Sequence, residues 1–309
     1  MTPQPPAGGA RPPALHWEIR AEIPAGAAEA ADTVLLELGD GGWSVLEDVP
    51  GRRAWVIGIF PGEDEAQGRW RILRPLLPAA PLGEPVVRPL PEAEWRDSYK
   101  AHFRAWSFGR LHWVPVWERP SFRLPPGHAV LWLDPGMAFG TGNHETTRLC
   151  IEELIAIDGA LAAAGAARKE LNVIDAGCGS GILALSAALL GFGRIEGFDN
   201  DPEAVRMSRE NAVLNAIDGR VHFFAADLAE GLKGRRADVL LANIQADILI
   251  RHASVLTGAI APRGVLVLSG ILALELEEVR SVFSRVAPEW PANTHTSGEW
   301  SSLVLSRPA

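Results

Sequence analysis

The sequence predicts a two-part protein in which a doubly wound parallel α/β sheet follows a small α+β unit. Three features predict this fold class. Residues 15–90 have the order β-α-β-β-α-β, five β-α units follow one another in the second half, and the apolar run 171–176 ends in a glycine-rich turn. The 309 residues are enough for two domains and a sizeable core.

The composition is that of a globular protein and narrows the function classes. No apolar run reaches about 18 residues, and residues 1–14 form a Pro/Gly-rich polar tail rather than a signal peptide. We therefore expect a disordered tail and a cytoplasmic protein that does not bind membranes. Two cysteines are too few for a disulfide framework. The net charge of −9 disfavours direct nucleic-acid binding and fits a basic protein partner better.

The first domain, residues 15–90, is predicted to be a ferredoxin-like sandwich. Its strands are expected at 15–22, 43–47, 53–60 and 85–90, and its helices at 25–38 and 63–77. It contains no cluster of catalytic residue types, so we expect it to hold a partner rather than to react with it.

A linker helix is predicted within residues 91–109. It begins with a helix-compatible proline and places Trp95, Tyr99, His102 and Trp106 at spacings of three to four, which makes an aromatic stripe on one face. Packing between domains is the first interpretation of this stripe. A substrate-docking face is the alternative.

The second domain, residues 110–309, begins with strands expected at 110–117 and 128–133. The segment D-P-G-M-A-F-G-T-G-N-H-E-T-T follows, and its glycines around Phe139 predict a compact loop able to close over a ligand. Asn143 is the expected cap of a helix over 144–157, which puts Thr147 in the first turn. No second histidine stands four residues after His144, so a zinc site is disfavoured.

The stretch D-A-G-C-G-S-G, residues 175–181, predicts a nucleoside site. Gly177, Gly179 and Gly181 lie between an apolar strand and an Ala/Leu-rich helix, where glycine tolerates φ > 0 and lets a ligand approach the backbone. The spacing is G-x-G-x-G with Asp175 two residues ahead, not the G-x-G-x-x-G of dinucleotide-binding proteins. The alternative is a packing turn in an unrelated α/β domain.

Polar residues follow three further strands of the predicted sheet. Asp199 ends strand 194–198 and could accept hydrogen bonds from both ribose hydroxyls, and Asp227 or its neighbouring backbone could meet the adenine amino group. Asn243 ends the apolar strand 237–242. Ligands of doubly wound sheets bind at the carboxyl ends of the strands, so we expect these residues to share one site.

These motifs, with N-I-Q-A at 243–246, S-G-I-L at 269–272 and G-E-W at 298–300, resemble the ribosomal protein L11 methyltransferase family, known as PrmA. The resemblance covers nearly the whole chain from about residue 15. It implies a Rossmann-like, seven-stranded class I methyltransferase domain that uses S-adenosylmethionine (SAM). It also implies methylation of lysine ε-amino groups and the N-terminal α-amine of ribosomal protein L11. We expect a monomer whose residues 15–90 recognise that substrate.

Motif matching to the family places SAM contacts on Thr147, Gly177, Asp199 and Asn243, with the loop of Phe139 and Thr141 closing over SAM. Together with the residues at the turn and strand ends, the expected cofactor-binding set is Phe139, Thr141, Thr147, Asp175, Gly177, Gly179, Gly181, Asp199, Asp227 and Asn243. Asn143 and Gln245 depart from the residues usual in the family and bear on the target and on the number of methyl groups.

Asn243 is the expected catalytic residue, since a neutral polar group at this strand end can orient the amine or the methionine part of SAM. Deprotonating a lysine at pH 7 costs about 4.6 kcal/mol in water. Desolvation and the sulfonium charge both lower this cost. The sequence contains no signature of a general base, so positioning and desolvation are the favoured mechanism.

The alternatives are an N-methyltransferase that acts on another protein or on a nucleic-acid base, a nicotinamide-dependent oxidoreductase, and a non-catalytic binding module. Methyltransferases acting on nucleic-acid bases typically have N-P-P-Y or D-P-P-Y at this strand end, but here Ile244, Gln245 and Ala246 follow the asparagine. A nicotinamide-dependent oxidoreductase would need the other glycine spacing. A non-catalytic module that binds SAM, or no ligand, is left open by the sequence.

Overall fold

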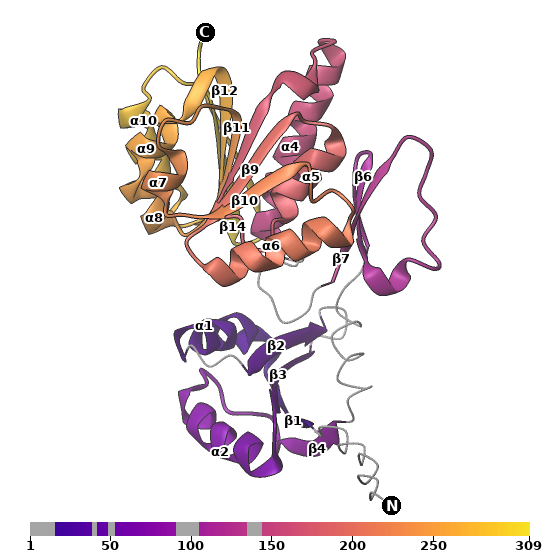
Figure 1. Ribbon diagram of the computed structural model, residues 1–309. Helices are drawn as coiled ribbons and strands as arrows, with labels where there is room; N and C mark the ends of the chain where they lie inside the picture. Colours follow the sequence, from indigo (N-terminus) through magenta and orange to yellow (C-terminus); the bar gives the residue numbers. More distant parts are fainter. Residues whose placement is uncertain (1–15, 39–41, 49–52, 91–104, 135–143) are drawn as a thin grey trace, which may run out of the picture. The chain divides into compact units, whose positions relative to one another are not determined.

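The computed structural model describes residues 16–38, 42–48, 53–90, 105–134 and 144–309, and the chain divides into two compact units (Figure 1). The described part of the first unit ends at Leu90, and that of the second begins at residue 105. No helix among these residues is long and apolar enough to cross a membrane.

The first unit has the predicted order of elements. Its strands are β1 (His16–Ile23), β2 (Trp43–Asp48), β3 (Arg53–Phe60) and β4 (Val86–Leu90), and its helices are α1 (Ala28–Leu38) and α2 (Glu63–Leu73). The strands form an antiparallel sheet in the order β2-β3-β1-β4. Alternate residues of β1 and β3, such as Ile19 and Val56, are buried in one core with Leu35 of α1 and Trp70 of α2.

The end of the predicted linker helix is wrong. Residues 91–104 lie outside the described residues, but Trp106–Phe108 form strand β5, which pairs antiparallel with β6 (Leu111–Pro115). Strand β6 pairs in parallel with β7 (Ala129–Leu133). Trp106 and Phe108 stack with their ring centroids 6.4 Å apart, and Phe108 packs edge-on against Trp113 at 4.7 Å. The aromatic residues here follow a period of two, because the segment pairs as a strand.

A seven-stranded sheet organises the second unit and confirms the predicted doubly wound architecture. Its order is β10-β9-β8-β11-β12-β14-β13. The first five strands are parallel: β8 (Asn172–Ala176), β9 (Arg194–Asp199), β10 (Val221–Ala225), β11 (Ala237–Asn243) and β12 (Ile260–Leu272). The antiparallel hairpin β13 (Ala292–Ser297) and β14 (Trp300–Ser306) closes one edge. The chain order reverses between β8 and β11, where such sheets bind ligands.

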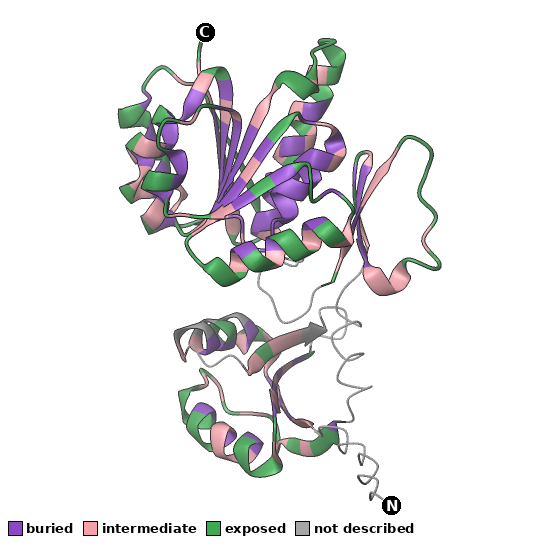
Figure 2. Cartoon of the chain, viewed as in Figure 1, coloured by how far each residue is buried: buried purple, intermediate pink, exposed green. Residues whose placement is uncertain are grey.

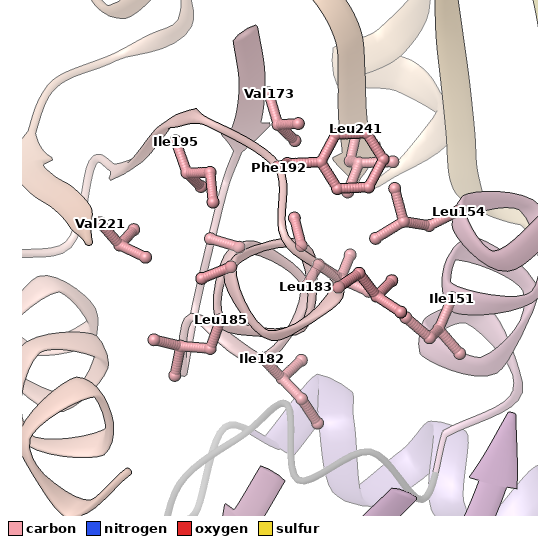
Figure 3. Close-up of a cluster of buried hydrophobic side chains, with 14 of the residues drawn as sticks. Ile151, Leu154, Val173, Ile182, Leu183, Leu185, Phe192, Ile195, Val221 and Leu241 are labelled. Carbon is pink, nitrogen blue, oxygen red and sulfur yellow. The ribbon is translucent and has the colours of Figure 1, made fainter. Parts of the chain in front are cut away.

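Helices cover both faces of this sheet (Figure 1). One face carries α4 (Glu145–Ala163), α5 (Ile182–Leu190) and α6 (Pro202–Leu214). The other carries α7 (Leu228–Leu232), α8 (Ala246–Arg251), α9 (Ala253–Gly258) and α10 (Leu276–Val286). The strands are buried between these layers (Figure 2), and the side chains of α5 are central to one of the two cores (Figure 3). The parallel strands are therefore apolar on both faces.

The first turn of α4 differs slightly from the prediction. His144, rather than Asn143, is the N-cap, and its Nδ1 accepts a hydrogen bond from the Thr146 N–H. Asn143 lies outside the described residues. Thr146 and Thr147 occupy the first turn, as predicted. The helix thus begins one residue later than expected and still places Thr147 beside the sheet.

Candidate active site

The glycine turn after β8 has a backbone that only glycine adopts without strain. Gly177, Gly179 and Gly181 have φ values of +74°, +51° and +79°. A Cβ on Gly177 would lie 2.5 Å from Cγ2 of Ile244, and one on Gly181 would lie 2.7 Å from Cβ of Ser208. The turn therefore has no room for side chains at these two positions.

Asp199 is held at the end of β9 by two backbone groups. Its Oδ2 accepts the N–H of Gly179 at 2.9 Å, and its Oδ1 accepts the N–H of Asp201 at 3.0 Å. A carboxylate oxygen can accept more than one hydrogen bond, so both oxygens keep acceptor capacity for a ligand. The carboxylate is thus oriented before any ligand arrives.

Asp175 is an acidic side chain buried at the base of the turn, only 1% exposed. Its Oδ2 accepts the N–H of Ala184 at 3.0 Å, whereas its buried Oδ1 has no hydrogen-bond partner among the described residues. Burial raises the pKa of the Asp175 carboxyl to about 7; the Ala184 N–H opposes this shift and the charge of Asp199 adds to it. An unsatisfied buried acceptor in a native site points to a missing donor.

Asn243 and Thr147 meet across the site, although they are 96 residues apart in the chain. Asn243 is the last residue of β11, and its Nδ2 donates to Oγ1 of Thr147 at 3.3 Å. Thr147 is 3% exposed in the first turn of α4. The structure therefore brings the expected catalytic residue against one of the expected SAM contacts.

Two cavities lie at the carboxyl ends of the strands. A cleft of about 480 Å³ is lined by Gly177, Gly179, Phe198, Asp199, Asn200, Ala226, Asp227, Leu228, Asn243, Ile244, Gln245, Ile248 and His252. A second cavity of about 290 Å³ is lined by Thr147, Asp175, Gly177, Cys178, Gly179, Ser180, Ile182, Leu183, Asp201, Glu203, Ala204, Met207 and Asn243. Gly177, Gly179 and Asn243 line both. The glycine turn and Asn243 therefore border both cavities.

Carboxylates dominate the charge of the residues that line the two cavities. Asp199 and Asp227 line the cleft, and Asp175, Asp201 and Glu203 line the second cavity. Among the residues that the structure describes, no lysine or arginine lines either one. Such a site favours a cationic ligand over one that carries phosphates.

The expected site residues fall into three groups. Thr147, Asp175, Gly177, Gly179, Asp199, Asp227 and Asn243 line the two cavities. Gly181 lines neither and packs against Ser208 and Phe223 instead. Phe139 and Thr141 lie outside the described residues. Asp227 also caps α7, because its Oδ1 accepts the N–H of Glu230 at 2.9 Å, so part of its acceptor capacity is used inside the protein.

Several lining residues were not anticipated as site residues, among them Asn200, Leu228, Ile248 and His252. Asn200 and Leu228 each follow an anticipated aspartate, so extending the strand-end argument by one residue would have found them. Ile248 and His252 come from α8 and its C-cap, four residues apart. Only the packing of α8 against the cleft identifies that pair.

Comparison with known proteins places this architecture in a family. The family model for ribosomal protein L11 methyltransferase (PrmA) matches residues 16–308. A ribosomal protein L11 methyltransferase of Trichlorobacter lovleyi is 42% identical over 232 residues, which cover 75% of this chain and 72% of that protein. One of Pelobacter propionicus is 38% identical over 314 residues, covering 95% and 98% of the two chains.

A solved structure agrees with these relatives. The ribosomal protein L11 methylase of Lactobacillus delbrueckii subsp. bulgaricus superimposes with a TM-score of 0.56 at 29% sequence identity. The match covers 67% of this chain and all of that one. With a family model that spans both units and relatives that cover almost the whole chain, this protein belongs to the ribosomal protein L11 methyltransferase family.

Proposed function

We propose that this protein is a SAM-dependent N-methyltransferase that modifies lysine ε-amino groups and the N-terminal α-amine of ribosomal protein L11. The observation that Asn243 lines both cavities carries the proposal. The sulfonium of SAM joins an adenosine part to an amino-acid part. A nucleoside cleft and a second, acidic cavity that share one polar residue match that division, and family membership supplies the substrate class.

The residues present fit SAM. The Asp199 carboxylate suits the two ribose hydroxyls, and the unsatisfied Oδ1 of Asp175 suits the ammonium of the amino-acid part. The acidic lining suits a sulfonium cation and opposes a dinucleotide, whose phosphates would meet carboxylates. The cavity volumes fall within the range of about 300–1,000 Å³ usual for small-molecule sites when taken together.

When bound, SAM supplies a methyl group whose bond to sulfur breaks, with its electron pair, as the amine lone pair forms the new C–N bond. The chain has to present that amine neutral and aligned. Desolvation and the nearby sulfonium charge lower the pKa of the amine, and Asn243, which lines both cavities, orients it. Solvent takes up the protons that leave the amine before and after transfer. Positioning and desolvation therefore carry the reaction in this proposal, without a dedicated base.

The first unit is proposed to be a ferredoxin-like domain that binds L11, with residues 91–104 as the link to the methyltransferase domain, since residues 106–108 belong to β5 of the second unit. Its β2-β3-β1-β4 order and two helices support the fold, and the position of all the proposed cofactor residues in the second unit supports the division of labour. We further propose that the protein acts in the cytoplasm as a monomer.

The proposed activity is tested by incubating the protein with methyl-labelled SAM and separated ribosomal proteins, and mapping the label by mass spectrometry. Label on lysines and the N-terminus of L11 is expected, with an incubation lacking the enzyme as control. Label confined to another ribosomal protein, or to RNA added in parallel, would contradict the substrate assignment while keeping the methyltransferase chemistry.

The division of labour is tested with a fragment that starts at residue 105, so that β5 keeps its pairing with β6. This fragment should keep its SAM affinity within about threefold and lose most L11 methylation, because the grip on the substrate is missing. Circular dichroism checks that the fragment is folded. A folded fragment that methylates L11 at the full rate would rule out the first unit as the recognition domain.

A further inference from the structure

The direction in which the Asn243 amide points decides whether it helps or hinders an attacking amine. A neutral amine has N–H donors and a single lone pair, and the lone pair must face the methyl group. A carbonyl oxygen holds an N–H and leaves the lone pair free, whereas an amide N–H would bond to the lone pair itself. One N–H of Asn243 Nδ2 donates to Oγ1 of Thr147, so the nitrogen end of the amide faces Thr147 and Oδ1 points away from it.

Ser269 links the two chain segments that carry this pair. It lies on β12, opposite Asn243 in the parallel register of β11 and β12. Its backbone carbonyl accepts the N–H of Ile244, the residue after Asn243, at 3.2 Å. Its hydroxyl donates to the carbonyl of Thr146, the residue before Thr147, at 3.0 Å. One serine thus holds a peptide adjacent to each partner.

Burial makes these hydrogen bonds difficult to replace. Ser269 is 0% exposed, and Thr146 and Thr147 are also buried, so water does not replace a lost bond. The following residue, Gly270, has φ +79°, and a Cβ there would lie 2.5 Å from the Ile244 carbonyl oxygen. This glycine allows β12 to approach the end of β11 closely. Ser269 itself lines neither cavity and reaches a ligand only through other residues.

We propose that Ser269 is a positioning residue for methyl transfer: by holding the Thr146 carbonyl and the Ile244 N–H, it sets the Thr147 hydroxyl against Nδ2 of Asn243 and turns the Asn243 carbonyl oxygen toward the amine. The consequence for turnover rests on the proposed function. The orientation of the amide does not, since it is a property of the protein alone.

The kinetic test compares Ser269→Ala with Ser302→Ala. Ser302 is 0% exposed on β14 of the same sheet, and its hydroxyl has no hydrogen-bond partner in the described part of the chain, so it is a matched control. Ser269→Ala should lower kcat for L11 methylation about tenfold, with KM and the Kd for SAM within about twofold. Ser302→Ala should leave all three unchanged. Equal kcat in the two variants would overturn the proposal.

A double variant separates positioning from general stability. Adding Ser269→Ala to Asn243→Ala should cause no further loss of kcat, because the side chain that Ser269 positions is already gone. A full additional tenfold loss in that background would show that Ser269 acts through the fold in general and would overturn the proposal.

Nuclear magnetic resonance gives a readout that needs no substrate. The Asn243 side-chain amide signals, assigned by their loss in Asn243→Ala, should shift and exchange faster with solvent in Ser269→Ala and stay unchanged in Ser302→Ala. Unchanged signals in Ser269→Ala would overturn the proposal. If the wild-type protein left L11 unmodified, the proposed function would fail, but these signals would still decide whether Ser269 sets the amide.

Discussion

The two ends of the parallel strands carry opposite chemistry. At the carboxyl ends, aspartates and Asn243 line cavities of about 480 and 290 Å³. At the amino ends, a cavity of about 260 Å³ is lined by Arg194, Arg235 and Arg236, together with Glu196. Glu196 is bound by Arg235 at 2.9 Å. We call the carboxyl ends of the parallel strands the acidic edge of the sheet and their amino ends the basic edge.

A cavity alone does not make a ligand-binding site. The basic edge has volume and charge, but the acidic edge also has the positive-φ turn, an oriented carboxylate and an unsatisfied buried acceptor. In a parallel sheet the carboxyl ends lead into loops and helix starts, where free N–H groups and turn glycines collect. The net charge of the whole chain does not reveal this separation of charge, which supports the proposal that the cleft binds a sulfonium.

The largest expected effect is on ribose binding at the acidic edge. Asp199→Ala should weaken SAM binding by about 2–3 kcal/mol, because two charge-assisted hydrogen bonds to the ribose are lost. Isothermal titration calorimetry measures the Kd for SAM in the variant and in the wild type. The same affinity in the variant and the wild type would remove Asp199 from the cofactor site.

Glycine substitutions at the two edges separate backbone strain from crowding. Gly177 has φ +74° with Ile244 in the way of a Cβ, while Gly234 at the basic edge has φ +69° and open space around it. Gly234→Ala should cost about 1 kcal/mol of stability through strain alone, and Gly177→Ala about twice that. Only Gly177→Ala should also weaken SAM binding. Chemical denaturation and calorimetry check both; equal losses would mean that Ile244 yields to the added methyl group.

The titration of Asp175 should make SAM affinity depend on pH. Burial raises the pKa of Asp175 to about 7, so the carboxyl is protonated in the free protein below that pH. A cationic ligand binds better to the carboxylate, so SAM affinity should rise by up to about tenfold per pH unit toward pH 7 and then level off. Asp175→Asn should flatten this dependence. An unchanged slope in the variant would assign the titration to another group.

The titration of Asp175 also makes folding stability depend on pH, but in the opposite direction to SAM affinity. Its unfolded pKa is about 3.9, so between about pH 4 and pH 7 the folded state binds more protons than the unfolded state. Its contribution to the stability of the ligand-free protein therefore falls as pH rises through this window. Denaturation of wild type and Asp175→Asn without SAM checks the sign.

The smallest expected effect tests the basic edge. Arg194→Ser, alone or with Arg236→Ser, should leave the Kd for SAM within about twofold, because these side chains lie at the opposite ends of the strands. Calorimetry beside Asp199→Ala makes the comparison direct. A loss as large as that of Asp199→Ala would mean that the charge of the whole domain, rather than the local lining, governs binding.

The sequence by itself determined the strands of the four-stranded and seven-stranded sheets, the glycine turn and the positions of Asp199 and Asn243. These follow from short patterns: apolar runs, glycine spacing, and the rule that polar residues at carboxyl strand ends converge. The helix predicted through residue 109 failed, because a spacing of three to four among aromatic residues does not exclude a strand whose pairing is non-local.

Only the tertiary structure decided which residues meet. The contact of Thr147 with Asn243 spans 96 residues, and that of Ser269 with Thr146 spans 123. The sequence also does not show that Asp175 has an unsatisfied oxygen, that Asn243 lines two cavities, or that the two ends of the parallel strands carry opposite charge. Each of these features depends on how strands and helices pack against one another. Local sequence patterns do not determine the distances between residues that are far apart in the chain.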